Sequence, residues 1–256
     1  MLQQTQAPRV VPAYRSFVRS FPSLRHLAGA RRSAVVAEWS GLGYPRRAVA
    51  LSEAARAIVR DRGGAVPSEP TALQELPGIG PYTAAAVASI AFDVPVAAVD
   101  TNVRRIVARV AFGTEADEVA ASDLAAVAHR WLDPRAPGTW SQALMDLGRE
   151  VCRPARPRCE GCPLARGCRF RASGALPRSA GKRQPPFEGS MRQTRGAVVR
   201  ELGAAPSRTL GGLVQVTGSP ADRVTDAVRG LAADGIVWAT RAALEGNPRA
   251  RVRLAD

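Results

Sequence analysis

All four cysteines of this chain fall within seventeen residues, and this cluster constrains the fold more than any other feature. They are Cys152, Cys159, Cys162 and Cys168, spaced C-x6-C-x2-C-x5-C. Disulfides are uncommon inside cells, and four free thiols would rarely gather in this way by chance. Four thiolates suit a tetrahedral zinc ion or an iron–sulfur cluster, and the spacing alone does not separate the two. The pattern predicts that a metal centre holds this segment together.

The charge of the chain predicts a polyanionic partner. Among 256 residues, 36 are Lys or Arg and 22 are Asp or Glu, which gives a net charge of +14. Residues 151–200 hold twelve of the basic residues against two acids, and such a cluster binds phosphates strongly through counterion release. Nucleic acid and an anionic membrane surface both fit this excess, although a GC-rich genome would also raise the arginine content.

No apolar run approaches the roughly 20 residues of a membrane span, and no signal peptide is recognisable. We therefore expect a cytoplasmic protein without a membrane partner, associated with the nucleoid in a bacterium.

Helical patterns dominate the chain before residue 200, and we find no convincing strand there. Helical periodicity covers 34–60, on both sides of a tight loop at 41–45, and then 81–92, 102–112, 122–132 and 139–151. Residues 173–190 are rich in Gly, Pro, Ser and Arg and are typical of a linker. Beyond it, three helices near 193–202, 209–216 and 220–234 precede two strand-like segments, 236–239 and 250–254, which could pair as a hairpin. This order favours a winged-helix-like module, which either contacts DNA or only stabilises the protein.

The stretch Leu76-Pro77-Gly78-Ile79-Gly80-Pro81 lies between two expected helices. Its two glycines allow a tight turn, and proline is well tolerated in the first turn of the helix that follows. Free backbone N–H groups at the positive end of that helix would suit a DNA phosphate. Taken alone, the motif is equally consistent with an ordinary turn between helices.

Asp100 directly precedes the helix expected at 102–112 and is predicted to cap it. A carboxylate held there as an anion could also stabilise a positive charge that develops on a sugar. The two roles are compatible.

Together, LPGIGPYTAAA, AVDTN and the cysteine spacing resemble the helix-hairpin-helix DNA glycosylases that carry an iron–sulfur cluster. The resemblance covers residues 1 to about 172 and implies a mainly α-helical glycosylase fold. It divides the chain into a helical barrel domain with the hairpin (1–95), an iron–sulfur cluster domain (96–172), a linker (173–190) and the small winged-helix-like domain (191–256). It also implies that the four cysteines hold a [4Fe-4S] cluster.

Two branches of this superfamily compete, endonuclease III and the adenine DNA glycosylases. Endonuclease III-like enzymes attack the sugar with a lysine two residues after the second hairpin glycine, where this chain has Tyr82. The only lysine of the chain is Lys182, in the linker. Tyr82, the opening LQQTQ and the GLGY at 41–44 resemble the adenine branch, whereas Thr101 is the residue found in the endonuclease III branch. The balance favours a monofunctional adenine DNA glycosylase, acting as a monomer on duplex DNA with adenine opposite 8-oxoguanine or guanine.

The resemblance also implies roles for individual residues. Asp100 would stabilise the oxocarbenium-like sugar, with Tyr82 and Asn102 shaping the site. We expect Gly78 and Gly80 to bind a DNA phosphate, and Gln4 and Tyr44 to wedge into the base stack. Leu2 and Thr5 would contact the orphaned guanine. Gln142 is a weaker candidate for contact with the flipped adenine.

Two departures from the family pattern limit this prediction. In adenine DNA glycosylases a glutamate just upstream of the LQQT stretch protonates adenine, and here it would fall before Met1. We therefore expect the chain to be truncated at its N-terminus, to bind DNA and to excise adenine poorly. Residues 191–256 are also too few for the Nudix-like domain that many members use to inspect 8-oxoguanine. The alternatives are an endonuclease III-like glycosylase and a glycosylase scaffold that binds DNA without catalysis.

Overall fold

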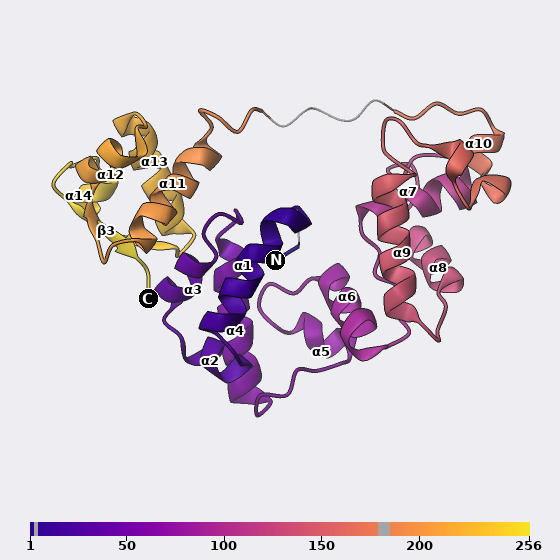
Figure 1. Cartoon of the computed structure of the whole chain (residues 1–256), viewed down its shortest axis with the longest axis horizontal. Helices are drawn as coiled ribbons and strands as arrows, with labels where there is room; N and C mark the ends of the chain where they lie inside the picture. The colour runs from indigo at the N-terminus through magenta and orange to yellow at the C-terminus, as the bar shows by residue number, and fades with distance from the viewer. Residues whose placement is uncertain (3–4, 179–184) are drawn as a thin grey trace. The chain divides into compact units, whose positions relative to one another are not determined.

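The computed structural model describes residues 1–2, 5–178 and 185–256 (Figure 1). Two of the residues discussed above, Gln4 and Lys182, lie outside this range. The described chain is mainly helical and forms two compact units. The first unit comprises Met1–Val66, Leu76–Gly78 and Gln184–Asp256, and the second comprises Pro67–Glu75 and Ile79–Arg183. None of the described helices combines the length and apolar character needed to cross a bilayer.

The first unit begins with four helices, α1 (Ala7–Ser20), α2 (Leu24–Gly29), α3 (Arg32–Glu38) and α4 (Arg46–Asp61). Helix α1 buries Val10 and Phe17, and the ring of Phe17 packs edge-on against Trp39, just after α3. The loop between α3 and α4 is the GLGY segment. Its glycines have positive φ angles, which lets the chain turn tightly between the two helices.

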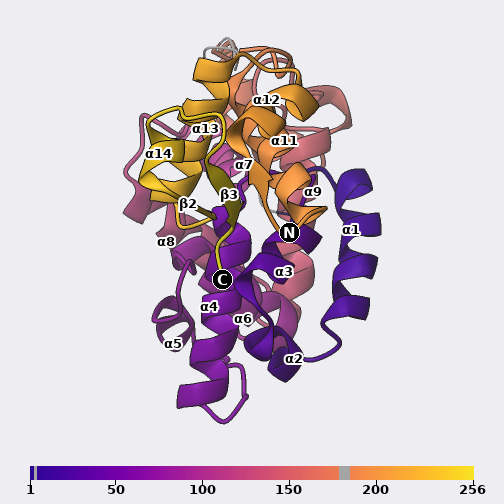
Figure 2. The same cartoon turned by 90° about the vertical axis from the view of Figure 1, so that its left-hand side faces the viewer.

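The C-terminal module of the first unit has the winged-helix-like order predicted from the sequence. Its elements are α11 (Met191–Gly203), β1 (Arg208–Thr209), α12 (Leu210–Thr217), α13 (Ala221–Ala233), β2 (Val237–Ala239), α14 (Arg241–Leu244) and β3 (Arg251–Leu254). Strands β2 and β3 pair antiparallel, so the predicted hairpin is confirmed (Figure 2). The sheet order is β1-β3-β2, and the sequence did not reveal β1 because it is only two residues long.

This module shares one hydrophobic core with the N-terminal helices. Val198, Val199 and Leu202 of α11 belong to the same buried cluster as Val35 and Val36 of α3. Gly203 allows close packing, since a Cβ there would lie 3.3 Å from the Cβ of Ala37. At the end of the chain, the Ser33 hydroxyl donates a 2.6 Å hydrogen bond to the Asp256 carboxylate. Residues at opposite ends of the sequence therefore form one packed body.

The second unit contains the helices on both sides of the glycine hairpin and the cysteine segment. Its elements are α5 (Pro70–Gln74), α6 (Pro81–Phe92), α7 (Thr101–Val107), a π-helical turn η1 (Ala108–Phe112), α8 (Ala121–Trp131), α9 (Pro137–Glu150), the 3₁₀ turns η2 (Cys159–Gly161) and η3 (Ala165–Gly167), and α10 (Arg169–Ala172). Its core is formed by the apolar faces of α7 and α8, including Val103, Val107 and Leu124.

Two glycines allow α9 to pack closely against α6 and α7. A Cβ at Gly138 would lie 2.8 Å from the Ser89 carbonyl oxygen, and one at Gly148 would lie 2.5 Å from the Cβ of Asn102. Real Cβ atoms essentially never make such short contacts. Helix α9 can therefore lie against the start of α7, where the candidate catalytic residues are found.

Candidate active site and cysteine pocket

Asp100 caps α7, as the sequence predicts. Its Oδ1 accepts a 2.7 Å hydrogen bond from the backbone N–H of Val103, and its Oδ2 accepts a 2.8 Å hydrogen bond from the side-chain amide of Asn102. The residue is half-buried. Both carboxylate oxygens are thus fixed, and the positive end of the α7 dipole favours a negative charge at this position.

Asn102 connects Asp100 to the first cysteine through an arginine that sequence reasoning missed. The Nη2 of Arg105 donates to the Oδ1 of Asn102 at 2.9 Å and to the carbonyl of Gly148 at 2.8 Å. Its Nε donates to the carbonyl of Cys152 at 2.7 Å. Burial lowers the pKa of Arg105, yet the guanidinium remains a cation in proteins. A continuous hydrogen-bonded path therefore runs from the Asp100 carboxylate to the backbone of the cysteine segment.

Tyr82 lies in the first turn of α6, at the position where an endonuclease III-like enzyme would carry its lysine. It is half-buried, and its hydroxyl donates to the sulfur of Met145 on α9 at 3.6 Å. Burial raises the pKa of Tyr82, and the negative charge of Asp100 raises it further. The phenol is consequently neutral at physiological pH. Gln142, the predicted adenine contact, is exposed one turn before Met145 on α9.

The two hairpin glycines differ in whether their position could accept a side chain. Gly78 has φ +74° and no room for a side chain, because a Cβ would lie 2.5 Å from the Cβ of Ala50. Gly80 is the extended N-cap residue of α6, and a Cβ there would meet nothing within 4 Å. Both glycines are exposed. The hairpin thus presents the start of α6 to solvent, with proline in its first turn.

In the first unit, Tyr44 and Thr5 contact a second arginine that the sequence did not single out. Arg47 donates to the Thr5 hydroxyl at 3.1 Å, to the Leu42 carbonyl at 3.0 Å and to the Met1 carbonyl at 3.2 Å. Its guanidinium also lies over the ring of Tyr44, 5.6 Å from the ring centroid. Arg47 therefore joins the opening segment to the GLGY loop.

Two of the residues predicted to contact DNA are exposed in this unit. Leu2 is 65% exposed and Tyr44 is 50% exposed. Tyr44 also adopts a left-handed backbone conformation with φ 49°, which is uncommon for a bulky residue and often marks a functional position. Gln4, the other predicted wedge residue, lies outside the described residues.

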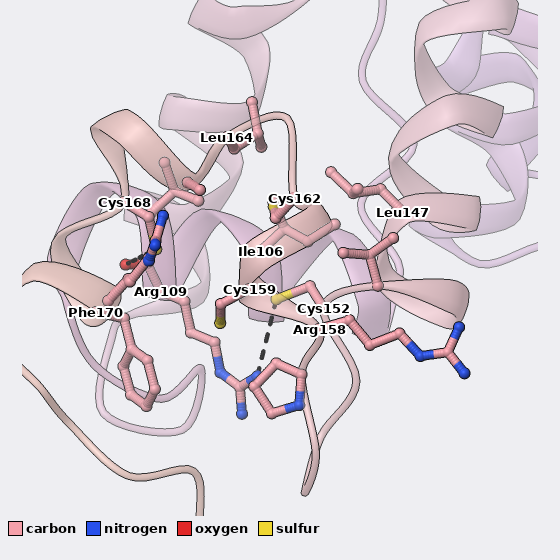
Figure 3. Close-up of a pocket in the computed structure, with 15 residues that line it drawn as sticks. Ile106, Arg109, Leu147, Cys152, Arg158, Cys159, Cys162, Leu164, Cys168 and Phe170 are labelled. Carbon is pink, nitrogen blue, oxygen red and sulfur yellow. Dashed lines mark hydrogen bonds between the residues drawn. The ribbon is translucent and has the colours of Figure 1, made fainter.

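The four cysteines line a single pocket, together with Arg109 and Phe170 (Figure 3). In the described part of the chain, no three His, Cys, Asp or Glu side chains could hold a single metal ion as they stand. A [4Fe-4S] cluster makes a different demand, because its four cysteines bind four separate iron atoms and surround the cluster without converging on one point. Four thiols around one pocket provide the donor set that such a cluster requires.

Arg109 is almost completely buried behind this pocket and organises the cysteine segment. Its guanidinium donates to the carbonyls of Arg153 and Pro154 at 2.8 and 2.7 Å, and it forms a 2.7 Å ion pair with Glu115. It also donates to the sulfur of Cys152 at 3.8 Å. Burial raises the pKa of Cys152, and the charge of Arg109 opposes this shift. The arginine supplies positive charge where a thiolate-rich centre would need it.

One protein-family model matches residues 1–128, and its description is HhH-GPD superfamily base excision DNA repair protein. The chain belongs to this superfamily. The adenine DNA glycosylase of Mycolicibacterium smegmatis is 40% identical over 202 residues, which cover 79% of this chain and 69% of that protein. The adenine DNA glycosylase of Rattus norvegicus is 44% identical over 172 residues, covering 66% of this chain and 33% of that protein. Within the HhH-GPD superfamily the chain is thus similar to adenine DNA glycosylases, which confirms the branch predicted from its motifs.

Comparison with solved structures supports the same fold. A thermostable thymine-DNA glycosylase matches with a TM-score of 0.63 and 29% sequence identity, covering 67% of this chain and 80% of that one. The helix-hairpin-helix glycosylase fold expected from the sequence is confirmed. The chain spans only a third of its rat relative, so the activity of the whole protein is treated below as a proposal.

Proposed function

We propose that this chain is a monofunctional DNA glycosylase that hydrolyses the N-glycosidic bond of adenine opposite 8-oxoguanine or guanine. The arrangement of Asp100 carries this proposal, since both of its oxygens are held at the start of α7. Tyr82 supports it, because a neutral phenol stands where a lyase needs an amine. The similarity to adenine DNA glycosylases supplies the substrate class.

In this reaction the bond between the sugar and adenine breaks, water adds to the sugar, and adenine leaves with a proton. Asp100 would stabilise the positive charge that develops on the sugar before water adds. Asn102 would keep the carboxylate oriented, and Tyr82 would limit access of water beside it.

DNA binding is proposed to use both units of the chain. The exposed start of α6, with Gly78 and Gly80, would bind a backbone phosphate. Extruding a base from the stack costs a few kcal/mol, and a wedge of Gln4 and Tyr44 would offset this by filling the gap. Leu2 and Thr5 would contact the orphaned guanine. Gln142 would contact the extruded adenine. We propose that the protein acts as a monomer.

Cys152, Cys159, Cys162 and Cys168 would hold a [4Fe-4S] cluster, which would supply a rigid centre for the basic loop around it. Arg109 holds the first part of this loop in place by donating hydrogen bonds to the backbone carbonyls of Arg153 and Pro154. Arg105 joins the same loop to Asn102 and thereby to Asp100. Order in the cysteine segment would therefore help to position the catalytic carboxylate.

The deciding experiment measures release of free adenine from duplexes containing A:8-oxoguanine, A:G and A:T under single-turnover conditions. The protein is tested as the 256-residue chain and with any in-frame residues encoded before Met1, so that the result does not depend on the start used. We expect at least one of the two forms to release adenine from the first two duplexes, and we expect Asp100→Asn to abolish that release. Asp123→Asn serves as the control, because Asp123 is an exposed carboxylate in the first turn of α8.

The alternatives predict different outcomes. Cleavage of an oxidised pyrimidine without adenine release would favour an endonuclease III-like enzyme. Tight binding to the A:8-oxoguanine duplex without release in either form would favour a non-catalytic scaffold.

A further inference from the structure

The outward face of the small sheet in the C-terminal module carries a basic and aromatic surface. Along β3, Val252 and Leu254 point into the core, whereas Arg251 and Arg253 alternate with them on the other face. Arg253 lies opposite Trp238 of β2 in the strand register, and its guanidinium lies 5.2 Å from the centroid of the Trp238 ring. We call Trp238, Arg251 and Arg253, together with Arg249 in the turn that precedes β3, the wing face.

Two of the three arginines of the wing face are free of ion pairs in the described part of the chain, whereas Arg253 pairs with Asp256 at 3.2 Å. Arg249 and Arg251 are exposed, and within the described residues neither forms an ion pair with a carboxylate. The Arg251 guanidinium donates to the Ser207 hydroxyl at 2.9 Å. Trp238 is 48% exposed, although a large aromatic residue is usually buried in a small domain. An exposed indole beside several guanidinium groups is a common composition for a surface that binds nucleic acid.

Helix α13 corresponds in chain order to the helix that enters the major groove in DNA-binding winged-helix domains. Unlike the wing face, the surface of α13 carries exposed acidic residues. Asp222 and Asp226 are both exposed on it. Arg229 is engaged with Asp226 at 2.9 Å and with the Leu244 carbonyl at 2.6 Å. Arg223 donates to the carbonyl of Gly189 at 2.7 Å. Exposed acids repel phosphates, so α13 is poorly suited to lie in a groove of DNA.

We propose that the C-terminal module binds the backbone of duplex DNA through the wing face, and that α13 faces away from the DNA. Arg249 and Arg251 bind phosphates, while the Trp238 ring packs against the sugar backbone with Arg253 holding its orientation. The contacts carry no base specificity, because phosphates and sugars are the same at every step. This inference rests on the DNA-directed function proposed above and gives the module a part in it.

The test compares two charge reversals of equal size in the full chain. One is Arg249→Glu with Arg251→Glu on the wing face, and the other is Arg223→Glu with Arg229→Glu on α13. Affinity for an undamaged fluorescein-labelled duplex and for an A:8-oxoguanine duplex is measured by anisotropy between 50 and 300 mM salt. Each lost phosphate contact lowers the salt slope by about 1. The wing-face variant should therefore lose a slope of about 2 and roughly tenfold in affinity on both duplexes.

The α13 variant has the same net charge and should lose far less affinity. Thermal unfolding of both variants checks that the module still folds, and Arg249→Gln with Arg251→Gln provides a milder wing-face change. An equal or larger loss from the α13 variant would overturn the proposal. Unchanged binding by both wing-face variants would also overturn it and would leave a protein partner or a purely structural role.

The rate of adenine release separates this inference from the proposed function. At sub-saturating protein, the wing-face variant should release adenine more slowly, in proportion to its lost affinity, whereas the α13 variant should release it at close to the wild-type rate. If no form of the protein releases adenine but the wing-face variant still loses affinity, the proposed function fails and the wing-face inference stands.

Discussion

Replacing Arg105 with methionine should weaken both the fold and catalysis, because one guanidinium joins three separate parts of the second unit. Its hydrogen bonds reach the Asn102 amide oxygen, the Gly148 carbonyl and the Cys152 carbonyl at 2.9, 2.8 and 2.7 Å. A methionine side chain fills a similar volume but donates no hydrogen bond. The Asn102, Gly148 and Cys152 oxygens would therefore each lose a charged donor. Such bonds contribute about 1.5–3 kcal/mol each and are not additive. We expect the free energy of unfolding to fall by about 2–4 kcal/mol.

The effect on catalysis should act through Asn102. Without Arg105, the Asn102 amide loses one of its two anchors, and its hydrogen bond to Asp100 is no longer fixed. A small displacement of a catalytic group lowers the rate by up to about 100-fold, so we expect single-turnover adenine release to slow roughly 10–100-fold. Arg105→Lys should recover part of the stability, because an ammonium keeps the charge. It should recover less of the rate, because it cannot reproduce the planar fork.

The assay combines chemical unfolding with single-turnover kinetics at saturating protein. Arg149→Met is the matched control, since Arg149 is an exposed arginine whose ion pairs with Asp146 and Glu150 lie at the surface and contribute little. Asn102→Ala provides a double-mutant cycle: Arg105→Met should add little rate loss in that background. Full additivity of the two rate effects, or a wild-type rate in Arg105→Met, would refute the reasoning.

Three further predictions concern the metal, the chemistry and the packing of α9. The purified protein should be yellow-brown, with broad absorbance at about 400 nm. A colourless protein with stoichiometric zinc would contradict the iron–sulfur assignment. Cys159→Ser should reduce the yield of folded protein, because metal binding and local folding are coupled. Borohydride treatment during turnover should trap no protein–DNA adduct. The pKa of Tyr82 is raised above the ordinary tyrosine value of about 10. Deprotonation of Tyr82 should therefore cause no change in activity as the pH rises to about 10. Gly148→Ala should lower the free energy of unfolding by about 1–3 kcal/mol despite the better helix propensity of alanine, because the new methyl overlaps Asn102; unchanged thermal unfolding would show that α9 can move to accommodate it.

Features with a local cause could be predicted from the sequence. The Asp100 cap depends on a hydrogen bond to a residue three positions away, and the four cysteines that line one pocket lie in one short stretch of the sequence. The β2–β3 pairing could likewise be anticipated from two short strand-like segments, 236–239 and 250–254. In each case the residues that interact are close in sequence, so their spacing carries the information.

The arginines that organise the candidate sites could not be predicted. Arg105 and Arg109 donate hydrogen bonds to backbone carbonyls more than 40 positions away. Because every residue has a backbone carbonyl, the residue types do not indicate which one accepts such a bond. Arg47 bridges the opening residues and the GLGY loop in the same way. In a chain with 36 basic residues, no individual arginine stands out. The π-helical turn that carries Arg109 was also expected to be ordinary helix, because its apolar periodicity continues that of α7.

The core shared by the N-terminal helices and the C-terminal module has a consequence for synthesis on the ribosome. Val35 and Val36 emerge early, but Val198 and Leu202, which belong to the same cluster, are made more than 150 residues later. At about 5–20 residues per second this delay is roughly 10–30 seconds. During that time the nascent N-terminal helices lack part of their core, whereas the second unit is encoded without interruption from Ile79 onward. The second unit should therefore become protease-resistant first on stalled ribosomes, and the start of the chain should be protected only after its end has been released.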